Sequence, residues 1–316
     1  MTQDAALKRG SFAIVADSGC DLPLAWFEQN GVGLVPFHIS LDGRDFLDCV
    51  EVAPADLYVA LASSTSAGST SQPSPGEWSR AYEEAIEQGY DQIVSVHVSS
   101  ALSGSISTAR MAARDLRHRI DQDLRIELLD SRTASAATGF VVEDLVRSRD
   151  AGLTLDEAIE HANLVIENAE MYFVPAEGVV MHWDGRGPEG IRGLFDRIAA
   201  HLAASRDLMW VDGRGETLRF SSSTDVNDLA ANLARKMSLT AHELGDLVYV
   251  EVCAGMPRFL TLIEKPLDTN EFVSRRIRIA DAGGATVCRA GLGATGVAFM
   301  PASLLEVARP TDIRQD

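Results

Sequence analysis

Hydroxyl side chains gather in four loops of the N-terminal half of the chain. Three of these loops follow predicted strands, and the fourth precedes a predicted helix; they span residues 17–21, 99–105, 130–133 and 69–75. Hydroxyls and the free N–H groups of helix N-termini can hold an anion without a lysine, and a carboxylate would suit such a cradle. N-caps and turns are the alternative explanation for any single loop. The loops around Thr70 and Ser99–Ser103, taken together, favour a ligand site.

Arg289 is a candidate charged hydrogen-bond donor to the same carboxylate. It stands at the end of a predicted strand, Thr286–Arg289, just before a glycine-rich stretch. A guanidinium can present a fork of two N–H groups to a carboxylate; the alternative is a surface arginine at the edge of a sheet. If Arg289 faces the ligand, affinity should change little between about pH 6 and 8, because arginine does not titrate there.

Catalytic motifs are weak in this sequence. It has no GxxxxGK[ST] phosphate loop, no HExxH zinc motif and no GxSxG nucleophile elbow. The histidines lack metal-ligand spacing, and His97 lies in an apolar run where a core position is expected. Gly291, Gly293 and Gly296 match GxGxxG, but no amphipathic helix follows, so we expect glycines that allow close backbone approach rather than a dinucleotide site. We therefore expect no catalytic residue, no cofactor and no metal.

Composition limits the partners of the chain. Its formal net charge of -18 opposes nucleic acid binding, which depends largely on neutralising phosphates. No apolar run of about 18 residues is present, so we expect no membrane insertion. The first ten residues lack the apolar region of a secretory signal. The four cysteines are scattered without CxxC spacing, which indicates free thiols and a cytoplasmic protein.

The elements that must position the loops alternate between strand and helix in the first half. Predicted strands cover Phe12–Ala16, Gly33–Phe37, Gln92–Val98 and Arg125–Leu129, with helical patterns between them. This alternation is typical of an α/β fold with a mostly parallel sheet and helices on both faces. Such a sheet binds ligands outside the carboxyl ends of its strands, where the hydroxyl loops lie.

The second half of the sequence has a looser pattern. Leu208–Val211 and Thr217–Phe220 flank turn residues and predict a hairpin, and further strands and a helix follow. We therefore expect an N-terminal α/β domain over residues 10–160, which carries the ligand loops. A mixed α/β domain is expected over residues 161–310.

In order and spacing, the motifs resemble those of the DegV family. The matching segments are Phe12–Pro23, Thr70–Glu77, Ser99–Ser105 and Asp130-Ser131, within residues of about 10–145, and Arg289–Val297 near the C-terminus. The resemblance implies two α/β domains with a long-chain fatty acid buried between them. The chain departs from the family in two places: Arg289 stands where the family usually has a histidine, and Leu218–Ser223 is nearly uncharged where the family tends to carry a basic run.

The resemblance further implies which residues hold the fatty acid. Its carboxylate would be bound by Thr70, with Ser71 beside it, and by Ser100 or Ser103 in the motif that includes Gly104. Some members present the fatty acid to a separate ATP-dependent fatty acid kinase, which makes a kinase subunit a candidate partner.

Three functions remain open from the sequence. The leading interpretation is a carrier or presenter of a fatty acid that has no catalytic activity of its own. The alternative is an α/β enzyme acting on a small phosphorylated or acyl substrate with Ser103 as nucleophile, although no partner base is identifiable. A regulatory protein whose ligand sets domain closure is the third.

Overall fold

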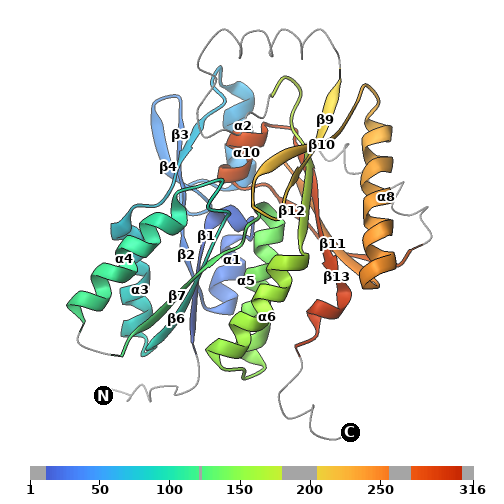
Figure 1. Ribbon diagram of the computed structural model, residues 1–316. Coiled ribbons are helices and arrows are strands. Elements are labelled where there is room, and N and C mark those ends of the chain that lie inside the picture. The colour runs from blue at the N-terminus through green and yellow to red at the C-terminus, as the bar shows by residue number, and fades with distance from the viewer. Residues whose placement is uncertain (1–11, 121–122, 180–204, 256–271, 308–316) are drawn as a thin grey trace, which may run out of the picture.

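The computed structural model describes residues 12–120, 123–179, 205–255 and 272–307 (Figure 1). Its helices are α1 (Leu24–Asn30), α2 (Pro54–Ser63), α3 (Pro75–Glu87), α4 (Ser105–Arg119), α5 (Ser135–Asp150), α6 (Leu155–Asn168), α8 (Val226–Leu244) and α10 (Gly284–Ala290), with short 3-10 turns η1 (Ser18–Cys20) and η3 (Ala302–Leu305). Its strands are β1 (Ala13–Asp17), β2 (Val32–Val35), β3 (His38–Leu41), β4 (Arg44–Leu47), β5 (Ser69–Ser71), β6 (Gln92–His97), β7 (Arg125–Asp130), β8 (Glu170–Val174), β9 (Arg206–Val211), β10 (Thr217–Ser223), β11 (Leu247–Cys253), β12 (Ser274–Asp281) and β13 (Thr295–Pro301). None of the helices in these ranges combines the length and apolar character that crossing a bilayer requires.

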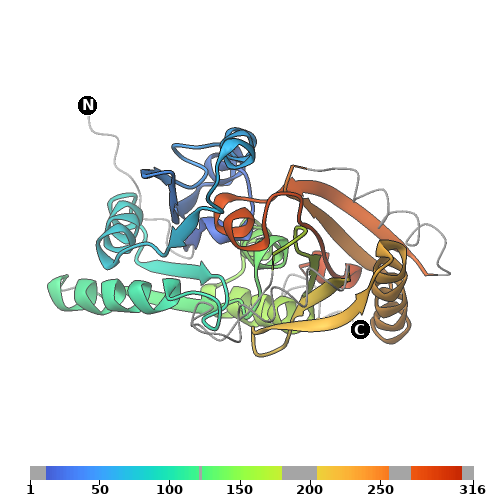
Figure 2. The same cartoon turned by 90° about the horizontal axis from the view of Figure 1, so that it is seen from above.

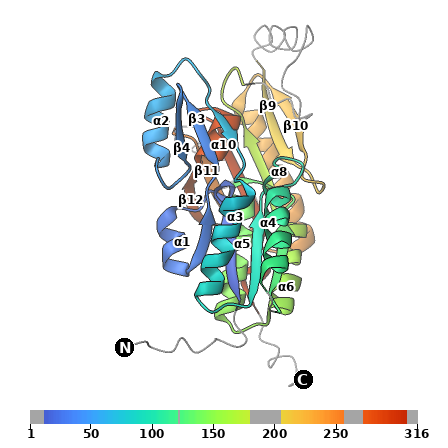
Figure 3. The same ribbon diagram turned by 90° about the vertical axis from the view of Figure 1, so that its left-hand side faces the viewer.

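Four parallel strands form the first sheet, in the order β2-β1-β6-β7. Trp78 and Tyr82 of α3, together with Leu116 of α4, pack on one face of this sheet. Phe27 of α1 and Phe140 of α5 pack on the other. Figure 3 shows α3 and α4 side by side on the near side of the molecule. The predicted parallel sheet with helices on both faces is confirmed.

Six strands form the second sheet, in the order β10-β9-β8-β13-β11-β12. All neighbours are antiparallel except β11 and β12, which makes the sheet mixed, as expected for this half of the chain. Helix α8 covers one face with Leu229 and Leu233. The other face packs against α5, where Val250 and Val252 share a core with Phe140. The division of the chain near residue 160 stays a prediction.

Local sequence signals begin and end several helices. Helix α1 ends at Gly31, whose φ of 58° lies in the left-handed region that glycine adopts without strain. Ser74 and Glu77 form a reciprocal capping box at the start of α3, and Thr154 and Glu157 do the same for α6. The first of these boxes starts α3 directly after the short loop that follows β5, the strand that carries Thr70.

A three-stranded antiparallel sheet, β4-β3-β5, completes the N-terminal half. Its strand β5 carries Thr70 and Ser71, and it packs against α10 from the C-terminal half. The three-residue strand has little sequence signal of its own, because Ser and Thr are equally common in turns.

Arg289 lies in helix α10, so the predicted strand Thr286–Arg289 is wrong. Thr286 and Val287 are β-branched, which locally favours a strand. Gly283 precedes the helix in an extended conformation, and Gly291, with a φ of 87°, follows it. A tertiary contact to the first backbone N–H groups of α10, described below, overrides the local preference.

Candidate functional site

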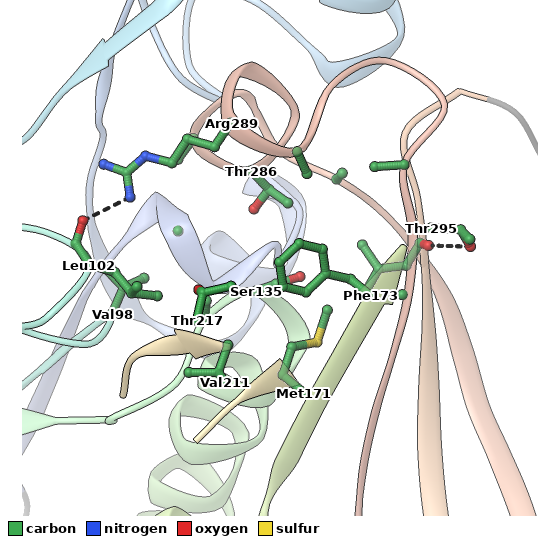
Figure 4. Close-up of a pocket in the computed structure, with 18 of the residues that line it drawn as sticks. Val98, Leu102, Ser135, Met171, Phe173, Val211, Thr217, Thr286, Arg289 and Thr295 are labelled. Carbon is green, nitrogen blue, oxygen red and sulfur yellow. Dashed lines mark hydrogen bonds between the residues drawn. The ribbon is translucent and has the colours of Figure 1, made fainter. Parts of the chain in front are cut away.

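An apolar cavity lies between the loops of the first sheet and the inner face of the second (Figure 4). It holds about 780 Å³ of atom-free space, including the part that opens to solvent. The N-terminal half contributes Gly19, Phe37, Val98, Leu102, Ala134 and Ser135 to its walls. The C-terminal half contributes Met171, Phe173, Val211, Thr217, Val252, Ala282, Ala285, Thr286, Arg289, Ala290, Ala294, Thr295 and Gly296. A mostly aliphatic lining with few polar groups suits a hydrocarbon ligand.

Buried Asp48 fixes the beginning of α10, which lies between the two halves of the molecule (Figure 2). Its carboxylate accepts hydrogen bonds from the backbone N–H groups of Gly284 and Ala285, at 2.8 and 3.2 Å. The hydroxyl of Ser18 donates to the same carboxylate at 2.8 Å. Burial raises the pKa of Asp48, and these three donors act in the opposite direction. The N-terminal half thus holds the helix that carries Arg289.

Asp21 makes a second connection between the two halves. It accepts hydrogen bonds from the backbone N–H of Gly283 and the hydroxyl of Thr286, both at 2.9 Å. The hydroxyl of Ser135 on α5 also donates to it. Burial raises the pKa of the Asp21 carboxyl to about 7, again against the effect of its donors. Thr286 and Ser135 are cavity-lining residues, so this carboxylate orients two hydroxyls of the wall.

Arg289 provides the positive charge at one end of the cavity. Its Nη1 atom donates to the carbonyl oxygen of Leu102 at 2.9 Å. Figure 4 shows Leu102 and Val98 at that same end. Burial lowers the pKa of Arg289, and the nearby carboxylate of Asp17 raises it. An anionic group entering this end would meet a guanidinium, which carries five N–H donors.

Asp17 lies buried next to this end of the cavity. Its carboxylate accepts from the hydroxyl of Ser105 at 2.7 Å and from the backbone N–H groups of Val98 and Gly19 at 3.2 Å. Burial raises the pKa of Asp17 to about 7, while its donors and the charge of Arg289 act against that rise. Asp17 therefore changes its ionisation near neutral pH, within the influence of the arginine.

His97 is a core residue, as the sequence indicated. Its ring lies 4.5 Å from the ring of Trp78, measured between centroids. The two ring nitrogens contact the hydroxyls of Ser95 and Ser105 at 3.0 and 3.2 Å. Burial lowers the pKa of His97 to about 3, so the ring is neutral at physiological pH.

The sequence candidates other than Arg289 lie beside the cavity and outside its walls. Thr70 is half-buried and Ser71 exposed on β5, which packs against α10. A Cβ atom placed on Gly104 would lie 3.0 Å from the side-chain nitrogen of Gln72. The loop after β5 and the loop before α4 are therefore neighbours, as the family motifs implied.

The loop before α4 also adjoins Arg289. Ser100 is exposed, and its backbone N–H donates to the side chain of Asp130 at 3.1 Å. Ser103 is half-buried and follows Leu102, whose carbonyl Arg289 contacts. The fold thus assembles the three predicted segments around one end of the cavity, although only Arg289 among the six candidates lines it.

Sequence reasoning missed the cavity walls that the second sheet provides. Met171 and Phe173 alternate with Tyr172 along β8, so both face the cavity. This alternation with a period of two is the signal by which the sequence could have indicated that wall. The expectation of close backbone approach holds at Gly296 on β13. A Cβ atom there would lie 2.8 Å from the carbonyl oxygen of Tyr172 and 2.7 Å from the side chain of Met171.

These features define a class: an α/β protein whose two sheets enclose an apolar cavity with an arginine at one end. The model of the DegV family, which is described as a family of uncharacterised proteins, matches residues 11–190. The chain belongs to the DegV family.

Relatives support this membership over about half of the chain. A DegV domain-containing protein of Mycobacterium tuberculosis is 35% identical over 164 residues, which make up 52% of this chain and 54% of that protein. One from Staphylococcus aureus is 29% identical over 161 residues, or 51% of this chain and 55% of the relative. The chain therefore spans about half the length of the curated relatives it matches.

Solved structures share the whole fold. A DegV family protein from Thermus thermophilus, described as fatty acid binding, is 20% identical with a TM-score of 0.78; the alignment covers 92% of this chain and 99% of that one. DegV of Bacillus subtilis, also described as a fatty acid binding protein, is 18% identical with a TM-score of 0.70, over 92% and 99% of the two chains. At such identities the likeness establishes the fold.

Proposed function

We propose that this chain binds a long-chain fatty acid, with the carboxylate at Arg289 and the hydrocarbon chain along the cavity. One observation carries the proposal: Arg289 is the only charged residue among the described residues that line a mostly aliphatic cavity. A buried guanidinium favours a carboxylate partner, and the aliphatic walls favour methylene groups. Neighbours of the same fold are described as binding fatty acids, including stearic acid in a protein from Eubacterium ventriosum.

The head-group site in this proposal extends beyond Arg289. Its further members are Thr70, Ser71, Ser100, Ser103 and Gly104. Their segments adjoin the arginine through α10 and Leu102, and hydroxyl donors beside a guanidinium would complete the hydrogen bonding of a carboxylate.

The role we propose is that of a carrier or presenter in the cytoplasm, without catalytic activity of its own. Among the described residues that line the cavity there is no histidine, cysteine or carboxylate to activate a nucleophile. Ser135 is the one serine there. The Asp21 carboxylate that accepts from its hydroxyl also accepts from Gly283 and Thr286, and we assign this carboxylate a structural role in holding α10. The four cysteines are free thiols, which suits a reducing compartment.

An ATP-dependent fatty acid kinase is the partner we propose, because a carrier needs an enzyme that uses its cargo.

Affinity should rise with acyl length if the cavity holds a hydrocarbon chain. Each buried methylene is worth about 0.8 kcal/mol, or about fourfold in affinity. Titration of saturated acids from octanoic to stearic acid should show this rise until the cavity is full. Mass spectrometry of the denatured, freshly purified protein should reveal a co-purified acyl chain. Affinity that is independent of chain length would contradict the proposal, and a co-purified phosphorylated metabolite would favour the enzyme alternative.

The sequence alone predicted that affinity changes little between about pH 6 and 8. Buried Asp17 changes that expectation. A bound carboxylate adds negative charge near Arg289, so it should raise the pKa of Asp17 above its value of about 7 in the free protein. Binding would then take up a proton, and affinity should fall as pH rises above about 7, by at most about tenfold per pH unit. Below about pH 6 Asp17 is protonated in both states and affinity should be constant.

The measurement is the affinity for one acid across pH 5.5 to 8.5 in the wild type and in Asp17→Asn. In Asp17→Asn, affinity should no longer fall as the pH rises above about 7. Three groups beside Asp17 should not titrate in this window: His97 has a pKa of about 3, burial raises the pKa of the Cys20 thiol, and Arg289 stays charged. Asp21, with a pKa of about 7, titrates in the same window, and the comparison with Asp17→Asn separates the effects of the two carboxyls. A wild-type profile that is flat throughout would show that Asp17 is not coupled to the ligand.

A further inference from the structure

Two hydroxyl side chains, Ser135 of α5 and Thr286 of α10, interrupt the aliphatic wall of the cavity. Thr286 is half-buried and precedes Arg289 by about one turn of α10, and both residues line the cavity. Figure 4 shows Thr286 and Ser135 between Arg289 and Phe173. A polar spot therefore lies along the path of the acyl chain, close to the end where we place the carboxylate.

Buried Asp21 fixes the direction in which these two hydroxyls donate. Its carboxylate accepts from the Thr286 hydroxyl with both oxygens, each at 2.9 Å, and it also accepts from the hydroxyl of Ser135. A hydroxyl has one hydrogen, so each of these oxygens keeps lone pairs that can accept a further hydrogen bond. Asp21 is not among the described residues that line the cavity. The wall thus offers two oriented acceptors at this point, and the carboxylate stays behind them.

The backbone holds these acceptors in place before a ligand arrives. Asp21 and Ser135 have φ angles of 51° and 56°, in the left-handed region that residues other than glycine adopt at a cost in free energy. Both are almost fully buried, at 4% and 2% exposure. Contacts among η1, α5 and α10 therefore determine where the two oxygens lie. A ligand that used them would lose little affinity to the ordering of side chains.

The acceptors match a donor that an unsubstituted acyl chain does not have. A methylene group cannot donate to the Thr286 oxygen, whereas a hydroxyl group on the chain can. Residues three apart on a helix have Cβ atoms about 5–6 Å apart, so a group bound at Thr286 must be near the carboxylate at Arg289. Thr217 of β10 also lines the cavity, but no hydrogen bond among the described residues orients its hydroxyl.

We infer that this cavity recognises fatty acids hydroxylated close to the carboxylate, and that Thr286 accepts the hydrogen bond from the hydroxyl of the ligand. Asp21 is the positioning residue, because it orients the Thr286 and Ser135 hydroxyls without touching the ligand. The inference rests on the proposed function, since it concerns the same cavity with the carboxylate at Arg289.

The test compares the affinity for 3-hydroxystearic acid with the affinity for stearic acid in the wild type and in Thr286→Val. The wild type should bind one enantiomer of the hydroxy acid about 2- to 10-fold more tightly than stearic acid, the range expected for one neutral hydrogen bond. The other enantiomer directs its hydroxyl away from Thr286 and should bind about fivefold or more weakly than stearic acid, because a buried hydroxyl is then left unpaired. In 12-hydroxystearic acid the hydroxyl is far from Thr286, so this acid should bind no more tightly than stearic acid.

Thr286→Val keeps the shape of the side chain and removes the acceptor, so the preference for the hydroxy acid should disappear. Thr286→Ser keeps the hydroxyl and should keep the preference. Thr217→Val makes the same exchange on another wall of the same cavity and should also keep it. The titrations are made at pH 8, above the pKa of about 7 of Asp21, so that its carboxylate accepts from both hydroxyls.

The ratio of the two affinities separates recognition of the hydroxyl from a general change in the protein. A wild type that binds stearic acid but does not prefer either enantiomer would overturn the inference and leave the proposed function intact, even if Thr286→Val does not fold. A preference that survives in Thr286→Val, or that is lost equally in Thr217→Val, would also overturn it. Failure of the wild type to bind either stearic acid or its hydroxy derivatives would overturn both proposals.

Discussion

Replacing Arg289 by alanine should lower the affinity for a long-chain fatty acid by about 10- to 100-fold. A hydrogen bond to a charged group is worth about 1.5–3 kcal/mol, and each 1.4 kcal/mol is a factor of ten in affinity. Arg289 is the only charge among the described lining residues, so no neighbouring cation of the wall can replace it. The measurement is a binding titration with stearic acid and with the matching alcohol. The variant should bind the acid poorly and leave the weaker binding of the alcohol nearly unchanged.

The controls separate the role of the charge from the role of the side chain in the fold. Arg289→Lys keeps the charge but loses the planar fork, and it should recover part of the affinity. Arg214→Ala removes an exposed arginine in the β9–β10 turn and should bind as the wild type does. Thr70→Ala and Ser103→Ala should each weaken binding without unfolding, within the range expected for one donor. If Arg289→Ala binds the acid normally, the carboxylate lies elsewhere and the orientation proposed for the ligand is wrong.

Replacing Asp48 by alanine should destabilise the protein by about 3 kcal/mol or more, because a buried donor left without an acceptor costs about 1–3 kcal/mol. The substitution removes the acceptor of three such donors, the Ser18 hydroxyl and the N–H groups of Gly284 and Ala285. It also releases the beginning of α10 from the N-terminal half. We therefore expect a lower midpoint in urea unfolding, and weaker fatty acid binding at temperatures where the variant is still folded, because α10 carries Arg289.

Two variants calibrate this result. Asp48→Asn keeps one acceptor oxygen and should lose less stability than the alanine variant. Asp45→Ala removes an exposed carboxylate on β4, three residues away, whose side chain contacts only the hydroxyl of Ser40 among the hydrogen bonds described. Its stability should change by no more than about 0.5 kcal/mol, as is usual at the surface. Equal losses in Asp45→Ala and Asp48→Ala would mean that the contact to α10 contributes little.

Sequence alone determined the N-terminal α/β arrangement and the order of the ligand loops. The strands of the first sheet are short apolar runs bounded by turn residues and helix caps, and both signals are local. The β9–β10 hairpin was predictable for the same reason, since the glycine-rich turn between residues 211 and 217 interrupts two β-rich runs. The core position of His97 also followed from its apolar neighbours. Each of these features depends on residues within about ten positions of one another.

Only the tertiary structure decided how Arg289 reaches the ligand and how the cavity is closed. The segment around Thr286 favours a strand by itself, but Asp48, 236 positions earlier than Gly284, binds its first N–H groups and begins a helix there. The walls formed by the second sheet depend on which face of β8 and β13 meets the first half. That choice comes from packing against α5, because alternation along a strand defines two faces without saying which one is covered. The local sequence therefore defines the individual loops and strands, and contacts between distant segments arrange them into the site.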